Sequence, residues 1–163
     1  MTSVLVVDDH ALVRAGLTAL LGGAERIDVV GEAADGAVAV ELAYRLRPDV
    51  VLMDLSMPVL DGVAATRGIL AGLPRTRVVV LSSFADRRRV SEAIQAGAVG
   101  YLIKDCDPHD IIAAVRAAPT GHAPIDPRVA GALRPRAAGT ASPRAGKSGR
   151  RRRLWDSLSI SSL

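Results

Sequence analysis

The sequence predicts an α/β fold: a doubly wound (βα)5 structure with a parallel sheet in the strand order 2-1-3-4-5. Short runs rich in Val, Ile and Leu are typical of parallel strands that are covered on both faces. Segments with apolar residues three or four positions apart, typical of helices, lie between these runs. The alternation of the two patterns predicts a parallel sheet with helical crossovers. The five expected strands are residues 4–7, 27–30, 50–53, 78–81 and 99–103.

The expected helices follow these strands and carry their own boundary signals. Four aspartates stand where N-caps are expected, namely Asp9, Asp35, Asp86 and Asp107. A proline disfavours helical geometry in the residue before it, so prolines end two of the helices before the next strand. The apolar positions of the helices are Val13, Leu17, Leu20 and Leu21; Val38, Leu42 and Leu46; Val90 and Ile94; and Ile111, Ile112 and Val115.

Length and charge divide the chain of 163 residues into one domain and a tail. Residues 1–118 have a net charge of −3, whereas residues 119–163 have a net charge of +7. We expect the domain at residues 1–118, a linker at residues 119–136 with a possible short helix from Asp126 to Leu133, and a basic tail of low order at residues 137–163. The basic balance of the whole chain therefore does not indicate a DNA-binding domain.

Several classes of protein are disfavoured by composition. No apolar run reaches the roughly 18 residues that a membrane span needs. The N-terminus has no basic region followed by a cleavage site, so we expect no export signal and no membrane partner. The single cysteine, Cys106, excludes an internal disulfide and agrees with a cytoplasmic location.

Polar residues stand where the expected strands end: Asp8, Asp9, Asp54, Ser82 and Lys104. In doubly wound sheets, ligands bind beyond the carboxyl ends of the strands. Three carboxylates in one pocket repel each other unless a cation lies among them, and Mg²⁺ is the natural choice for oxygen ligands. Lys104 could pair with a carboxylate and then with a phosphoryl oxygen, and Ser82 could donate a hydrogen bond to the same group. Each residue alone is ordinary as a cap or a loop residue, but the joint pattern indicates a site.

These residues lie in runs that resemble the receiver domain of two-component response regulators, which has a flavodoxin-like fold. The opening Val-Leu-Val-Val-Asp-Asp-His spans residues 4–10, and Val-Leu-Met-Asp-Leu-Ser-Met-Pro spans residues 51–58, with Asp-Gly at residues 61–62. Residues 78–82 and 97–105 match the remaining signature strands. The resemblance covers about residues 1–118 and implies a phosphorelay function in signal transduction.

The details of the motifs resemble the NarL/LuxR-type transcriptional branch of the family. The opening Asp-Asp-His and the pair Lys104-Asp105 carry this resemblance. Many other receivers have a proline after the lysine, where Asp105 stands here. Members of this branch continue into a C-terminal helix-turn-helix domain, which we do not expect to be intact in this chain.

The resemblance implies a role for each residue of the phosphorylation site. Asp54 is the implied phosphoacceptor, and a sensor histidine kinase is the implied donor. Asp9 is expected to bind Mg²⁺ directly, Asp8 mainly through water, and the backbone carbonyl of Ser56 to supply another ligand, with Asp54 completing the site. Lys104 is expected to contact the phosphoryl group.

The resemblance also implies a conformational switch. Ser82 is the implied switch hydroxyl, which is drawn toward the phosphoryl group. Tyr101 is the implied switch aromatic, which turns inward as Ser82 moves. The outer face of the fourth and fifth helices then changes, and a homodimer through this face is possible.

A signalling module of this kind is not an enzyme, and two alternatives belong to other classes. A phosphatase of the haloacid dehalogenase type would also use Asp54 as a nucleophile, but it needs a second acid where Ser56 stands. A flavin carrier would need a phosphate loop rich in Ser and Thr after the first strand. Asp8 and Asp9 would repel phosphate there.

The tail at residues 137–163 lacks the apolar positions of a four-helix DNA-binding domain. A reading-frame shift near Ser142-Pro143-Arg144 is our favoured hypothesis, and a divergent disordered tail is the alternative. In both cases we expect no sequence-specific DNA binding, because no recognition helix is present. Any affinity for DNA should be weak and should fall with salt.

Overall fold

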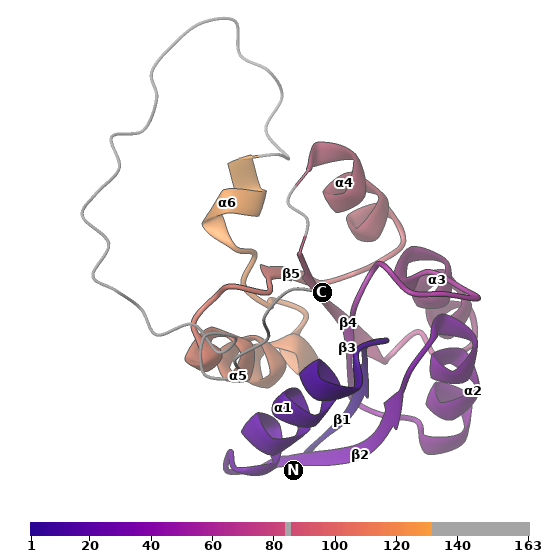
Figure 1. Ribbon diagram of the computed structural model, residues 1–163, viewed down its shortest axis with the longest axis vertical. Coiled ribbons are helices and arrows are strands. Elements are labelled where there is room, and N and C mark those ends of the chain that lie inside the picture. Colours follow the sequence, from indigo (N-terminus) through magenta and orange to yellow (C-terminus); the bar gives the residue numbers. More distant parts are fainter. Residues whose placement is uncertain (84–85, 132–163) are drawn as a thin grey trace, which may run out of the picture.

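The computed structural model describes residues 1–83 and 86–131, and it contains the expected five-stranded parallel sheet. The strand order is β2-β1-β3-β4-β5, which confirms the predicted 2-1-3-4-5 topology (Figure 1). Strand β2 is longer than the apolar run predicted, because Gly31 and Glu32 pair with Leu5 and Val6 of β1. The strands are β1 (Thr2–Val7), β2 (Ile27–Ala33), β3 (Val50–Met53), β4 (Arg77–Ser82) and β5 (Gly100–Ile103).

Helices follow the strands along the chain, and their starts test the predicted caps. The carboxylates of Asp35, Asp86 and Asp107 each accept a backbone N–H of the first turn, as predicted. Asp9 is not a cap: the Asp8 carboxylate accepts the N–H of His10, and the helix begins one residue later than predicted. The helices are α1 (Ala11–Gly22), α2 (Gly36–Leu46), α3 (Gly62–Gly72), α4 (Arg87–Gln95) and α5 (Pro108–Ala117).

The helices cover both faces of the sheet and leave the carboxyl ends of the strands open for a site. Helices α1 and α5 pack on one face and α2 and α3 on the other, as Figure 1 shows. Helix α4 contributes Val90 and Ala93 to a third apolar cluster with Tyr101. This arrangement covers the apolar strands on both faces, as their composition predicted.

The chain beyond α5 continues on the surface of the same domain. A 3-10 turn, η1 (Ala118–Thr120), leads to a short helix, α6 (Pro127–Ala130), whose N-cap is Asp126. This helix lies within the range Asp126 to Leu133 that the sequence indicated; residues 132 and 133 are outside the described part. The expectations for residues 137–163 also fall outside it. No helix among the described residues has the length and apolar character needed to cross a membrane.

Candidate functional site

The pairing of β1 with β3 brings the first two carboxylates of the site together. Val7 and Met53 are register partners at the ends of these strands, so Asp8 and Asp54 follow at the same level. The N–H of Asp54 donates to the Val7 carbonyl at 3.0 Å. Gly62 opens α3 directly against the backbone carbonyl of Asp54, where a Cβ atom would clash. The start of α3 is thereby packed close under the loop that carries Asp54.

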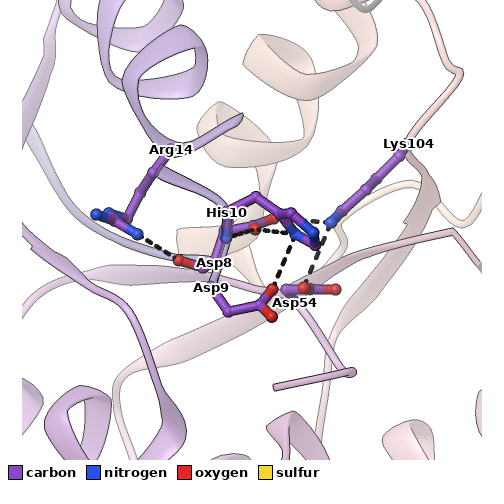
Figure 2. A network of polar contacts seen from close by, with 6 residues as sticks. All are labelled: Asp8, Asp9, His10, Arg14, Asp54 and Lys104. Atoms are coloured by element: carbon purple, nitrogen blue, oxygen red, sulfur yellow. Dashed lines mark hydrogen bonds and ion pairs between the residues drawn. The ribbon is translucent and has the colours of Figure 1, made fainter. Parts of the chain in front are cut away.

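The carboxylates of the site lie close to one another (Figure 2). One ligand atom from each of Asp8, Asp9, His10 and Asp54 falls within 4.8 Å of the others. The side chains of Asp8 and Asp54 are buried, and that of Asp9 is partly exposed. Three acidic groups at this spacing form a strongly negative cluster.

Lys104 supplies the positive charge that faces these carboxylates. Ser82 and Ile103 are register partners on β4 and β5, so Lys104 emerges one residue beyond them, and its N–H donates to the Ser82 carbonyl at 2.9 Å. Its Nζ atom lies 2.8 Å from Asp8 Oδ2 and 3.3 Å from Asp54 Oδ2. The ammonium group therefore bridges two buried acids that come from two different strands.

The site also includes two polar residues, His10 and Arg14, that the pattern of polar strand ends did not indicate. His10 Nδ1 lies 3.0 Å from Asp9 Oδ1 and 3.5 Å from Asp8 Oδ1. Arg14, one helical turn after His10, donates from Nη1 to the Asp8 carbonyl at 2.8 Å. Their position in the sequence was the available signal, because His10 directly follows Asp9 as the N-cap residue of α1 and Arg14 lies near the start of that helix.

The environment of Asp54 changes its acidity. Burial raises the pKa of Asp54 to about 6, with Lys104 opposing the rise and the charges of Asp8 and Asp9 adding to it. A raised pKa in a buried cluster of acids is typical of a functional site. The carboxyl group still ionises below neutral pH, so it is mainly a carboxylate at pH 7.

Ser82 and Tyr101 are joined on the same side of the sheet. Both residues are fully buried, and a hydrogen bond links their side-chain hydroxyls. Burial raises the pKa of Tyr101, and the Asp54 charge adds a small contribution in the same direction. The aromatic ring thus occupies an inward position in this structure, next to the end of β4.

The residues present fit a divalent cation with oxygen ligands. Asp9 Oδ1 is a buried atom that accepts no hydrogen bond; His10 Nδ1, 3.0 Å away, can pair with it only when the imidazole is protonated. This oxygen belongs to the cluster with Asp8 and Asp54. Carboxylate oxygens of this kind are the donors that Mg²⁺ prefers. Ser56 is half-buried two residues beyond Asp54, and its predicted role as a carbonyl ligand stays a prediction.

Comparisons with known proteins agree with this geometry. Residues 4–116 match the family described as the response regulator receiver domain. The chain is 44% identical over 133 residues to the transcriptional regulatory protein LiaR of Bacillus subtilis, covering 82% of this chain and 63% of that protein. It is 42% identical over 131 residues to the response regulator protein VraR of Staphylococcus epidermidis, covering 80% of this chain and 63% of that protein. The chain thus spans less than two thirds of the length of these relatives.

Solved structures show the same similarity. A two-component response regulator of the LuxR family from Aurantimonas sp. has a TM-score of 0.78 at 32% identity, covering 82% of this chain and 95% of that one. The signal receiver domain of the putative response regulator NarL from Mycobacterium tuberculosis has a TM-score of 0.71 at 39% identity, covering 74% of this chain and 98% of that one.

Proposed function

We propose a phosphotransfer function, from the premise that this chain belongs to the response regulator receiver domain family, as its match over residues 4–116 shows. In this proposal Asp54 accepts a phosphoryl group from the phosphohistidine of a sensor histidine kinase, and the domain changes shape in response. The observation that carries the proposal is the buried Asp54 carboxylate beside Asp8 and Asp9, with Lys104 Nζ at 3.3 Å.

The proposed reaction is a nucleophilic displacement at phosphorus. An Asp54 oxygen forms the new P–O bond while the P–N bond of the donor breaks, and the electron pair returns to the donor imidazole. A pKa of about 6 leaves Asp54 mainly ionised at pH 7, as a nucleophile must be. Lys104, which already bridges Asp8 and Asp54, can shift to hold a phosphoryl oxygen.

The proposed metal ligands are Asp8, Asp9, Asp54 and the carbonyl of Ser56. Mg²⁺ bound there would offset the repulsion between the carboxylates and the incoming phosphate. The buried Asp9 oxygen that accepts no hydrogen bond and the acidic cluster support this part of the proposal. Lys104 neutralises only part of the charge of three carboxylates, so a cation is needed before a phosphoryl group can approach.

The proposed output is a switch through Ser82 and Tyr101. A phosphoryl group on Asp54 adds nearly two negative charges, which attract the Ser82 hydroxyl. Tyr101 is bonded to that hydroxyl and already lies inward, so the charge would stabilise the arrangement seen here. Hydrolysis of the acyl phosphate would reset the switch.

The proposed partners follow from the family. They are a sensor histidine kinase in the cytoplasm and, through the face of α4 and α5, a second copy of the chain. The relatives named as transcriptional regulators suggest control of transcription as the final output. The expectation about DNA binding depends on residues 137–163, which lie outside the described part, so it stays a prediction.

The experiment is phosphorylation by acetyl phosphate in the presence of Mg²⁺. Intact-mass measurement should show one added phosphoryl group, and Asp54→Asn should abolish it. Asp28→Asn is the matched control, because Asp28 is exposed on β2 and belongs to no part of the site. Undiminished labelling of the Asp54→Asn protein would refute the assignment of the phosphoacceptor.

A further inference from the structure

The segment at residues 123–129 covers the outer edge of β5, which ends the sheet. Ile125 forms a parallel bridge with Tyr101, and the N–H of Asp126 donates to the Tyr101 carbonyl at 2.9 Å. The Ile103 N–H donates to the Asp126 carboxylate. The edge of a sheet presents unpaired backbone groups that attract other strands. Here part of that edge is satisfied by the chain's own segment.

Apolar packing holds the same segment against the domain. Val129 is fully buried and joins the cluster that contains Val90 of α4 and Tyr101 of β5. Ala123 is buried over Gly100, where a Cβ atom would lie 2.8 Å from the Ala123 Cβ. In Figure 1, α6 lies beside β5, to the left of α4 and above α5. The segment is therefore part of the packed structure around Tyr101.

Charge ties the segment to the residue that follows the site lysine. Arg128 Nη2 lies 2.6 Å from Asp105 Oδ1 and 2.8 Å from Asp126 Oδ2. Arg128 Nε donates to Asp126 Oδ1 at 3.1 Å. Since Asp105 is bonded directly to Lys104, the segment and the candidate phosphorylation site share one short stretch of chain, residues 101–105.

We propose that residues 123–129 form a clamp over Tyr101 that docks more tightly when Asp54 carries a phosphoryl group. Tyr101 is fully buried in the cluster that contains Val129, and Ile125 packs against that cluster, so an outward turn of the ring would disturb the packing of this segment. The docked clamp and the inward ring therefore stabilise each other. The proposal rests on the proposed phosphorylation of Asp54 and adds the element that would respond to it.

The link to Asp54 runs through two hydroxyl groups. The Ser82 hydroxyl can donate its proton to a phosphoryl oxygen while its oxygen accepts from the Tyr101 hydroxyl. Hydrogen bonds in such a chain polarise and strengthen one another. A phosphoryl group would thus favour the inward ring, and the inward ring favours the clamp. Because such coupling is reciprocal, loosening the clamp must weaken binding of a phosphoryl mimic by the same factor.

The test measures amide hydrogen exchange of the clamp with and without beryllofluoride and Mg²⁺, using the full chain. Exchange of the Asp126, Val129 and Ala130 amides, all hydrogen-bonded here, should slow by about fivefold or more when the mimic binds. Arg128→Gln should speed this exchange and weaken beryllofluoride binding by a matching factor in calorimetric titration. Arg116→Gln, on α5 and bonded to the Glu25 carbonyl, is the control and should change neither.

Tyr101→Phe separates the coupling from folding. It keeps the buried ring but removes the hydroxyl, so the clamp should stay docked and its exchange should no longer respond to beryllofluoride. If beryllofluoride binds the unaltered chain but leaves the exchange of the clamp unchanged, the clamp is refuted and the proposed function stands. If the chain neither binds beryllofluoride nor is labelled by acetyl phosphate, the proposed function fails and the clamp fails with it.

Discussion

Replacing Val129 by alanine tests whether the segment after α5 belongs to the folded domain. The Val129 side chain is fully buried among Tyr101, Val90 and their neighbours, so the change removes two methyl groups from a packed cluster. The lost transfer free energy is about 0.8 kcal/mol per methyl group, or roughly 1.6 kcal/mol in all. The remaining cavity raises the expected loss of the free energy of unfolding to ~2 kcal/mol or somewhat more. For a domain of this size the midpoint of thermal unfolding should fall by about 6–8 °C.

Urea unfolding followed by circular dichroism measures this loss, and Val38→Ala is the matched control. Val38 lies on α2 with a side chain that is 38% exposed, so its truncation should change the free energy of unfolding by less than about 0.5 kcal/mol. The dependence of the free energy on urea should be the same in both variants. If Val129→Ala is no more destabilising than Val38→Ala, residues 123–129 are not docked and the packing argument is wrong.

Asp9→Ala should weaken Mg²⁺ binding in calorimetric titration far more than Asp35→Ala, because Asp9 faces the other carboxylates whereas Asp35 caps α2. Equal Mg²⁺ affinities of the two variants would contradict the proposed metal site. Burial raises the pKa of Asp126, but the hydrogen bonds from Arg128 outweigh it and hold that pKa below its usual value. Asp126 therefore stabilises the fold above the unfolded pKa of about 3.9, and this stability is lost as pH falls through the lower folded pKa. Asp126→Asn should flatten the dependence of the free energy of unfolding on pH in this acidic range. An unaltered slope between about pH 5 and pH 2 would contradict the role of Asp126. Burial raises the pKa of the Cys106 thiol to about 12. Alkylation of Cys106 by iodoacetamide at about pH 8 should therefore be at least about tenfold slower in the folded chain than in urea. Equal rates of alkylation would contradict the burial of this thiol.

The sequence predicted most of the fold because the signals for strands and helices are local. A strand buried on both faces needs a run of apolar residues, and such runs located all five strands, with β3 at its observed bounds. The predicted bounds were wrong where strand pairing extends into polar residues, as at Glu32 of β2. One predicted helix cap was also wrong. Asp9 does not cap α1 because the Asp8 carboxylate takes the neighbouring N–H.

The sequence also indicated which residues would gather at the carboxyl ends of the strands. Asp8, Asp9, Asp54 and Lys104 do come together in the structure. This was predictable because the apolar runs locate the strand ends and the family resemblance implies the order of the strands. Their individual roles stay predictions. The pattern of polar strand ends did not include His10, whose approach to Asp9 depends on the turn into α1.

By itself, then, the sequence determined the succession of elements and the chemistry at the strand ends, since both are properties of short stretches of chain. Only the tertiary structure shows that residues 119–131, which the sequence presented as part of a linker with a possible short helix, pack against the domain. Val129 is buried because β5 lies at the edge of the sheet and Gly100 leaves room for Ala123. Arg128 reaches Asp105 across 23 residues of chain, a contact that no local pattern encodes. Burial of so few apolar groups depends on the surface that the rest of the domain offers, and that surface exists only after the sheet has formed.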